Sequence, residues 1–420
     1  MEKNIKTTIL IVVLLLGIAQ VSFAQDFYKK TTRDTIQNIL TSTINGGEIA
    51  LQEGSYGPLS LRHISGSKEK PLIIKSADRN RPAKFTGFFL DDAHNIVLED
   101  LVFDYTFRPG DPPHLRPFEV SSSENIIIRS SIFDGDVARD SDSYSNGFGN
   151  AYGLSINESQ NIFILGNKIS GFLRGIVINN SKNIKIERNE LEGMRSDGMN
   201  LAQVEGAEII ENYIHDFKVS NGSRDHGDMI QVWTNGTSSP TSDIRIENNI
   251  LSSGLGRYTQ SIFMRNDLVD RGLAGKEMYY RNITIEGNLI INAHLHGITV
   301  GETIGLLLKN NTIVRNATSA GIENNISLWT PKIGVARDSM DVTIANNVVS
   351  KITGYDGQSD WKVVDNFFVQ DTARMEPGFY GHVFTKKVLK DQTNFASFAP
   401  LIGGPLDNTG IGSPILGPSE

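Results

Sequence analysis

Residues 161–167 read Asn161-Ile-Phe-Ile-Leu-Gly-Asn167, and this pattern of a polar residue, alternating aliphatic residues and a final Asn recurs along most of the chain. Further copies span Asn183 to Asn189, Gly206 to Asn212, Asp243 to Asn249, Asn282 to Asn288, Gly305 to Asn311, Asp341 to Asn347 and Asp360 to Asn366. Two earlier copies begin at Asn95 and Asn125 but end on Leu101 and Ser131, which predicts a weaker turn there. The chain is therefore predicted to be a solenoid of stacked repeats.

The repeat interval and its period indicate which solenoid this is. Successive final Asn residues lie 22, 23, 37, 39, 23, 36 and 19 residues apart, so a coil of about 22 residues carries occasional insertions. Segments such as Ile184-Lys-Ile186 alternate with the period of a strand rather than a helix. Short strands joined by Asn and Gly turns cannot fold singly and must stack, which predicts an all-β parallel β-helix. Inward Asn side chains at the same turn can bond to each other along the axis as an Asn ladder.

Composition and charge restrict the class of protein. The chain has 420 residues, a formal net charge of −8 and no Cys. A solenoid of this length can be one domain because it grows by addition of coils. The acidic balance argues against a nucleic-acid partner, whose phosphates need a basic face. We expect a monomer.

The first residues are typical of an export signal. Lys3 and Lys6 precede an apolar run from Thr8 to Ile18, and Ser22-Phe-Ala24 offers small residues for cleavage, so residues 1–24 are predicted to be removed. A membrane anchor is the alternative, but the apolar run is short for a bilayer span. Without Cys, neither disulfides nor a lipid-modified Cys can form. We expect a periplasmic or secreted protein with no membrane span after signal removal.

The mature chain, residues 25–420, is predicted to be a single β-helix domain with covered ends. Residues 25–46 contain a predicted short helix (Thr31 to Leu40) that would cap the first coil, because open solenoid ends expose strand edges. After the last repeat, residues 379–420 lose the pattern and are rich in Gly and Pro. We predict that this segment is irregular and covers the C-terminal end.

The segment that leads into the repeats carries a family resemblance. The stretches Gly47-Glu-Ile-Ala-Leu-Gln-Glu-Gly-Ser-Tyr-Gly57 and Pro71-Leu-Ile-Ile-Lys-Ser76 are similar to the start of the alginate lyase and chondroitinase B group, polysaccharide lyase family 6. The resemblance implies a right-handed β-helix that acts on an acidic polysaccharide, with an alginate-like polymer as the first choice. The Lys and Arg signature segments of that family are absent from the centre of this chain, so its catalytic residues cannot be carried over.

A second strand frame collects polar residues in the central coils. The frame contains Gly153-Leu-Ser-Ile-Asn157, Gly175-Ile-Val-Ile-Asn179, Gly198-Met-Asn-Leu-Ala202, Asp228-Met-Ile-Gln-Val232, Ser261-Ile-Phe-Met-Arg265 and Gly297-Ile-Thr-Val-Gly301. The residues just before these strands stack about 4.8 Å apart from coil to coil. Only in the central coils do they form a cluster of polar and ionisable side chains. They are Arg195 and Asp197, then Asp225, His226 and Asp228, then Tyr258 and Gln260, then His294 and His296, with Arg174 in an outer coil. Insertions at 218–224, 234–242 and 267–280 leave the same coils and could wall a groove, so this face is the candidate active site.

This cluster suits proton abstraction from a uronate polymer. The proton at C5 lies next to a carboxylate, which a cation must neutralise while a base reaches C5. We expect His226 to be the base, with Lys218 as the alternative, and Tyr258 to be the proton donor; Arg195 and Arg265 would hold the substrate carboxylate. Substrate contacts are expected from Gln260, His294, His296 and Arg174. Asp197, Asp225 and Asp228 could bind Ca²⁺, because that ion prefers oxygen ligands.

Other reactions and roles fit the same residues. If the C4 leaving group departs, the protein is a polysaccharide lyase; if C5 is reprotonated from the opposite face, it is a C5-epimerase, although the Asp-Pro-His segment of mannuronan epimerases is absent. Asp197 and Asp228 could instead be the carboxylate pair of a glycoside hydrolase. A carbohydrate-binding β-helix without catalysis would show aromatic platforms and would not need His226. His215 lies outside the frame and is expected to be structural.

Overall fold

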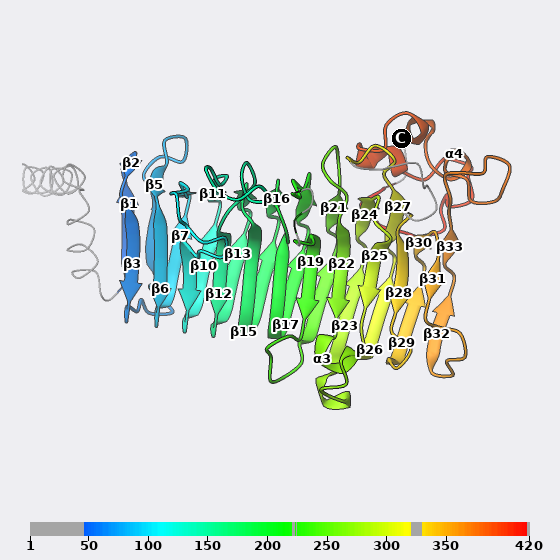
Figure 1. Cartoon of the computed structure of the whole chain (residues 1–420), viewed down its shortest axis with the longest axis horizontal. Coiled ribbons are helices and arrows are strands. Elements are labelled where there is room, and N and C mark those ends of the chain that lie inside the picture. The colour runs from blue at the N-terminus through cyan, green and yellow to red at the C-terminus, as the bar shows by residue number, and fades with distance from the viewer. Residues whose placement is uncertain (1–45, 221–222, 224, 321–329, 418–420) are drawn as a thin grey trace, which may run out of the picture.

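The computed structural model describes residues 46–220, 223, 225–320 and 330–417, which form one elongated stack of coils (Figure 1). Each coil contributes up to three short strands, and these pair in parallel with the strands of neighbouring coils to make three long rows. Strands β15 (Arg174–Glu187) and β17 (Met199–Ile210) run through two of the rows without a break, so these rows form one 21-stranded sheet. The third row is a separate 12-stranded sheet. The predicted all-β parallel solenoid is confirmed.

The rows follow one another around each coil in the order first, third, second. The first row contains β1 (Gly47–Leu51), β4 (Leu72–Ser76), β7 (His94–Glu99), β10 (Glu124–Arg129), β13 (Gln160–Leu165), β20 (Ser242–Glu247), β23 (Tyr280–Glu286), β26 (Thr303–Lys309), β29 (Met340–Ala345) and β32 (Trp361–Val364), with the later halves of β15 and β17. The second row contains β3 (Pro58–Arg62), β6 (Gly87–Asp91), β9 (Phe118–Ser121), β12 (Tyr152–Asn157), β19 (Asp228–Trp233), β22 (Gln260–Arg265), β25 (His296–Val300), β28 (Lys332–Val335) and β31 (Ile352–Thr353), with the earlier halves of β15 and β17. The third row contains β2 (Gly54–Ser55), β5 (Ala83–Phe85), β8 (Val102–Asp104), β11 (Ile132–Asp134), β14 (Lys168–Ser170), β16 (Glu190–Glu192), β18 (Tyr213–His215), β21 (Ile250–Ser252), β24 (Leu289–Asn292), β27 (Thr312–Arg315), β30 (Val348–Val349) and β33 (Phe367–Phe368). Short helical turns are α3 (Asp267–Asp270), η1 (Lys276–Met278), α4 (Tyr380–Val383), η3 (Lys386–Leu389) and η4 (Phe395–Phe398).

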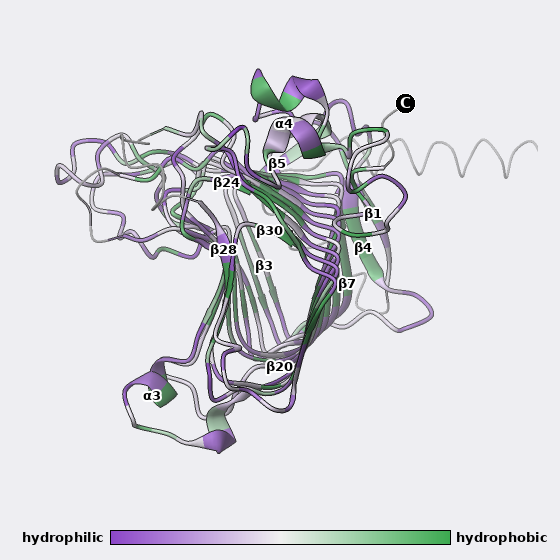
Figure 2. Ribbon diagram, turned by 90° about the vertical axis from the view of Figure 1, so that its right-hand side faces the viewer, coloured by the Kyte–Doolittle hydropathy of each residue, from purple (hydrophilic) through white to green (hydrophobic). Residues whose placement is uncertain are grey.

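The core runs down the inside of the coils, as the view along the stack shows (Figure 2). Period-two alternation buries one face of each strand: in β20, Ile244 and Ile246 are buried while Asp243 and Arg245 point to solvent. The same position of successive coils holds the same kind of residue, so aliphatic side chains stack into continuous columns. No coil could bury this surface alone, and stability therefore comes from stacking.

The Asn ladder forms as predicted. Asn167, Asn189, Asn212, Asn249, Asn288, Asn311 and Asn347 are buried. From Asn189 onward, each ladder Asn accepts the backbone N–H and the side-chain amide of the ladder residue one coil earlier. The residue before each ladder position takes a positive φ, for example 56° at Glu211, which makes the tight turn. At Ser131 the hydroxyl accepts the Leu101 N–H, so the turn continues with a weaker side chain, as the sequence indicated.

The segments beyond the coils were predicted to cover the ends. The predicted signal, residues 1–24, and nearly all of the predicted cap at 25–46 lie outside the described residues. Residues 379–417 consist mainly of turns and three short helices, and Tyr380, Phe384 and Phe398 pack with Leu289 and Val314 of the third row. This segment therefore covers a lateral face of the late coils, visible at the top of Figure 1, because the outward side of β24 and β27 is apolar there.

Candidate active site

A line of polar residues crosses the start of the second-row strands, and we call it the site row. In coil order its members are Tyr152, Arg174, Asp197, Asp228, Gln260, His296 and Lys332. Tyr152 pairs in register with Arg174, Asp228 with Gln260, and His296 with Lys332. The Gly175 N–H donates to the Asp197 carbonyl and the Gly198 N–H to the Asp228 carbonyl, which places the two acids in consecutive coils. The second frame found in the sequence is thus one aligned row, except that Met229 rather than Asp228 lies level with Gly198, so the predicted register was wrong by one residue in that coil.

Glycine follows several members of the site row, including Asp197, at a position that faces the interior of the coil. A Cβ on Gly198 would lie 2.6 Å from the Met229 carbonyl oxygen and 3.0 Å from Ile214 Cγ2, so that position faces the packed interior. Met199 also faces the core, so two consecutive residues point inward where the coil bends. The residue before the glycine, Asp197, therefore lies on the outer side of the bend, where it meets Asn200.

Four side chains of consecutive coils form a connected ionic group, the Asp–His cluster. Arg174 Nε lies 2.9 Å from Asp197 Oδ2, and His226 Nδ1 lies 3.0 Å from Asp228 Oδ2. One ligand atom each from Asp197, His226 and Asp228 lie within 4.8 Å of one another. Both aspartates are 0% exposed, whereas the His226 side chain is 59% exposed. The imidazole is thus the one member of this trio that a substrate can reach, and its Nε2 remains free of the Asp228 contact.

Burial and pairing change the proton affinities of this cluster. Burial raises the pKa of Asp228 to about 7, although its hydrogen bond with His226 opposes the rise. Burial also raises the pKa of Asp197, against the nearby Arg174 charge. The hydrogen bond with Asp228 raises the pKa of His226. A carboxyl pKa of about 7 at Asp228 and a raised imidazole pKa at His226 suit groups that exchange a proton at working pH.

The other predicted residues are divided between four places. Arg195 is buried and donates from Nε and Nη2 to one oxygen of Asp225, at 2.9 and 2.7 Å. This pair removes Asp225 from the acid–histidine trio and makes Arg195 a poor partner for a substrate carboxylate. Lys218 is exposed beside the turn at Gly193, and its amine makes no ion pair with a described residue. Among the described residues, no hydrogen bond or ion pair joins Lys218 to His226.

Arg265 lies at the opposite end of its strand from the site row. It is five residues beyond Gln260 on β22, a displacement of roughly 17 Å in a strand. Its guanidinium binds Asp270 of α3 at 2.7 Å. Arg265 is therefore not brought together with His226, because it lies at the far end of β22 from Gln260, the residue that pairs with Asp228. The insertions at 234–242 and 267–280 leave from this same far end and do not flank the Asp–His cluster.

The predicted aromatic and histidine residues form a ring stack beside the cluster. The rings of Tyr258 and His294 are 6.1 Å apart and nearly parallel, and His294 lies 5.3 Å from His296. Burial lowers the pKa of His294 to about 4, so this ring is neutral at physiological pH. Because Gln260 pairs with Asp228, the stack begins in the coil that follows the Asp–His cluster. Tyr258, Gln260, His294 and His296 are thus grouped on the predicted face.

Sequence reasoning missed the polar residues that continue the site along the strands. Asn200 donates to Asp197 Oδ2 at 3.1 Å and contacts Gln231 of the next coil. Arg174 also lies over the rings of Tyr152 and Trp233, at 5.6 Å from each centroid. Asn200 and Gln231 occupy an outward position that holds apolar or small residues in the other coils of the frame. The change to amide side chains in these two coils is the sequence signal that could have identified them.

The Asp–His cluster offers a donor set for a metal, but the set does not suit calcium. Two carboxylates and one imidazole converge, and the Asp228 Oδ1 is buried without a hydrogen-bond partner among the described residues. Calcium takes six to eight oxygen ligands, whereas Asp225 is held away by Arg195 and Asp197 is already bound to Arg174. The predicted triplet of Asp197, Asp225 and Asp228 is therefore not assembled.

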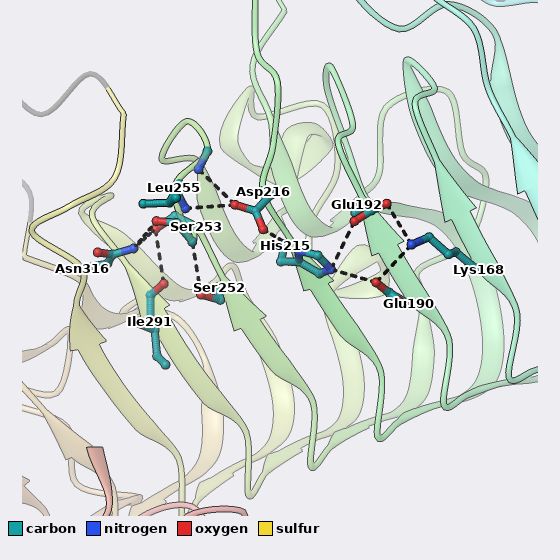
Figure 3. A network of polar contacts seen from close by, with 12 residues as sticks. Lys168, Glu190, Glu192, His215, Asp216, Ser252, Ser253, Leu255, Ile291 and Asn316 are labelled. Carbon is teal, nitrogen blue, oxygen red and sulfur yellow. Dashed lines mark hydrogen bonds and ion pairs between the residues drawn. The ribbon is translucent and has the colours of Figure 1, made fainter. Parts of the chain in front are cut away.

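A second charged group lies on the outward face of the third row and forms a closed network (Figure 3). Lys168 bridges Glu190 and Glu192, and His215 binds Glu190 and Asp216. Asp216 also accepts the N–H groups of Leu255 and Gly256 at 2.9 and 3.1 Å. Glu190, Glu192 and His215 could also hold a metal by geometry, but their charges are already paired within the network. The arrangement agrees with a structural role for His215.

Comparison with known proteins agrees with this architecture. A family model described as the right handed beta helix region matches residues 74–257. The chain is a right-handed parallel β-helix. It resembles polysaccharide lyase family 6 in fold only, and no curated protein matches it by sequence.

Solved structures with similar folds have different activities. The surface adhesin PfbA of Streptococcus pneumoniae is 14% identical, with a TM-score of 0.44, and the alignment covers 80% of this chain and 86% of PfbA. The family 6 alginate lyase AlyGC is 13% identical with a TM-score of 0.44, and the match covers 83% of this chain but 52% of the lyase. A variant of the periplasmic alginate epimerase AlgG is 12% identical with a TM-score of 0.42, covering 76% and 79%. The likeness concerns the fold alone.

No helix within the described residues is long and apolar enough to cross a bilayer.

Proposed function

We propose that the protein is an exported polysaccharide lyase that cleaves a uronic-acid-containing polymer by β-elimination, with alginate-like chains as the first substrates to test. The observation that carries the proposal is the exposed imidazole of His226 backed by the buried carboxylate of Asp228. A histidine oriented through Nδ1 by a carboxylate presents its other nitrogen as a base. The predicted signal at residues 1–24 would direct the proposed enzyme to the periplasm or out of the cell.

In the proposed reaction, His226 Nε2 removes the proton at C5 of a uronate residue. The C5–H electron pair forms the C4–C5 double bond while the C4–O bond breaks, and Tyr258 protonates the departing oxygen. Arg174 would hold the uronate carboxylate: its Nε is fixed by Asp197 and one Nη contacts the Tyr152 hydroxyl, which leaves further donors for substrate. This role is given to Arg174, which lies in the site row and is 17% exposed. Arg195 is only 5% exposed, and Arg265 lies at the far end of its strand.

The burial of Asp197 and Asp228 favours β-elimination over hydrolysis. A glycosidase acid must touch the glycosidic oxygen, but Asp197 and Asp228 expose none of their surface. The exposed base and the adjacent guanidinium instead match the two needs of C5 proton abstraction. C5-epimerisation shares that first step and is the alternative, differing in whether a proton returns to C5 before the C4–O bond breaks. No step is assigned to calcium.

The test is the ultraviolet absorbance of the unsaturated uronate product. The purified protein acting on alginate, chondroitin, hyaluronan or pectate is expected to raise the absorbance on one polymer, equally with added Ca²⁺ and with a chelator. Hydrogen exchange at C5 without any rise in absorbance would replace the lyase by the epimerase. Binding of a polymer with neither signal would instead support the carbohydrate-binding alternative and overturn the enzyme.

Replacing Asp228 by Asn should change the pH dependence of the proposed reaction. His226 acts only when unprotonated, and Asp228 raises its pKa, so wild-type kcat/KM should increase with pH through a pKa above the ordinary value. The substituted asparagine carries no charge, so the pKa of His226 should fall and the acidic limb should move to lower pH. The maximal rate should also drop by about 10²-fold as the ring loses its orientation.

The matched control for this pH experiment is Asp225→Asn, since Asp225 pairs with Arg195 rather than His226. Its acidic limb should coincide with that of the wild type. If Asp228→Asn leaves the limb unmoved in pH–rate profiles, His226 is not the titrating base.

A further inference from the structure

A pocket of about 360 Å³ opens on the outward face of the second row, among the coils that follow the Asp–His cluster. It arises where one outward position changes from large to small. Phe263 on β22 pairs in register with Thr299 on β25, which pairs with Gly334 on β28. The Phe263 ring thus stands beside a floor of small residues, and the missing side-chain volume is the hollow.

The walls of this pocket have the chemistry of a sugar site. Arg265 and Asp270 lie on one side as an ion pair 2.7 Å apart. His296 lines the pocket with its Nδ1 2.9 Å from the Thr299 hydroxyl, and its ring meets Phe263 edge-on at 5.2 Å. An aromatic ring with a few convergent polar groups is the usual composition of a small-ligand pocket.

Lys332 gives the pocket an available positive charge. It pairs with His296 in the strand register, lines the pocket and forms no ion pair with any described carboxylate. In contrast, Arg265 is already paired with Asp270. Glu302 also lines the pocket, but burial raises the pKa of its carboxyl group and so favours its neutral form. An anionic ligand would therefore find its partner at Lys332, while the Arg265–Asp270 pair is left to bond with hydroxyl groups.

We propose that this pocket is a subsite for one acidic sugar residue of a bound polysaccharide, with Lys332 pairing with the sugar carboxylate and Phe263 contacting the ring. The inference rests on the proposed function for its substrate class, and extends it by assigning residues that hold the polymer away from the reacting bond. The pocket and the cluster lie on one sheet face. His296 stands two coils beyond Asp228 along the site row, about 10 Å away at the strand spacing, so a short oligosaccharide spans both.

The subsite is tested by calorimetric binding to the full chain carrying His226→Ala, which cannot consume the probe. The probes are hexasaccharides of alginate, polygalacturonate and chondroitin, with cellohexaose as the neutral probe. Lys332→Gln in that background should weaken the best acidic probe by roughly tenfold to a hundredfold, the value of one charged hydrogen bond. Gly334→Leu, which fills the hollow without changing charge, should weaken it as well.

The matched control is Lys309→Gln, which removes the same charge from a lysine of the first row that pairs with Glu286. It should keep the affinity of the parent chain. Unchanged affinity in Lys332→Gln would overturn the carboxylate contact, and unchanged affinity in Gly334→Leu would overturn the pocket. Cellohexaose binding as tightly as the acidic probes, or no binding of any acidic probe, would overturn the ligand class. Because binding is the readout, a protein without lyase activity can still confirm the subsite.

Discussion

Replacing His226 by Ala is expected to lower turnover of the uronate polymer by about 10³-fold while the polymer still binds. The imidazole is the exposed member of a cluster whose carboxylates are buried, so no neighbouring group of that cluster can take its place at C5. Substrate contacts from Arg174 and the ring stack are retained, so KM should change little. Initial rates from product absorbance give both constants.

The same variant should fold as the wild type does, because most of the His226 side chain is in solvent. Equal thermal unfolding midpoints would establish this. His63→Ala is the control, since His63 is also exposed and paired with an aspartate, Asp92, but lies in an early coil. Full activity in His63→Ala and near-wild-type turnover in His226→Ala together would remove His226 from the mechanism, and with it the lyase proposal in its present form.

Replacing Asn249 by Ala is expected to lower the free energy of unfolding by about 4 kcal/mol, the largest stability effect we predict. Asn249 is fully buried, and its Oδ1 accepts both the backbone N–H and the side-chain amide of Asn212 at 2.9 Å. Its own amide donates to the Ile209 carbonyl and to Asn288. Alanine would leave these partners buried and unpaired and would open a void. Urea denaturation followed by circular dichroism measures the loss.

Asn366→Ala provides the comparison within the ladder. Asn366 makes equivalent bonds to Asn347 and to the Ile344 and Val364 carbonyls, but it is half-buried at the end of the ladder, where water can replace it. Its loss should cost about 1 kcal/mol. Equal costs at the two positions would mean that burial within the ladder does not set the energy.

Much of the fold was accessible from sequence because its signals are local and repeated. The spacing of Asn167, Asn189 and their successors determines the register between coils, and two-residue alternation determines which side chains enter the core. The second frame correctly placed Arg174 and Asp197 at one position, since residues at equal positions of stacked coils must be neighbours, but it set Asp228 one residue out of register, level with Gly198.

The pairing of charges within the site could not be predicted in this way. Arg195, Asp225 and Asp228 are equally close in the frame, and only the path of the turns decides that Arg195 takes Asp225 and leaves Asp228 to His226. The frame groups Arg265 with the site because the strand β22 begins there, but Arg265 is the last residue of that strand and lies at its far end. Its partner Asp270 sits in an insertion that has no repeat to align it.

The sequence by itself thus determined the β-helix, its ladder and the face on which the polar residues gather, because each follows from a period shared by successive coils. The tertiary structure alone decided which acids are buried, which imidazole is exposed and where the row of outward side chains becomes a pocket. Exposure and charge pairing depend on turns, insertions and neighbouring side-chain volumes, and these differ from coil to coil. Phe263, Thr299 and Gly334 occupy one position of the frame, yet only their packed volumes create the hollow beside Lys332.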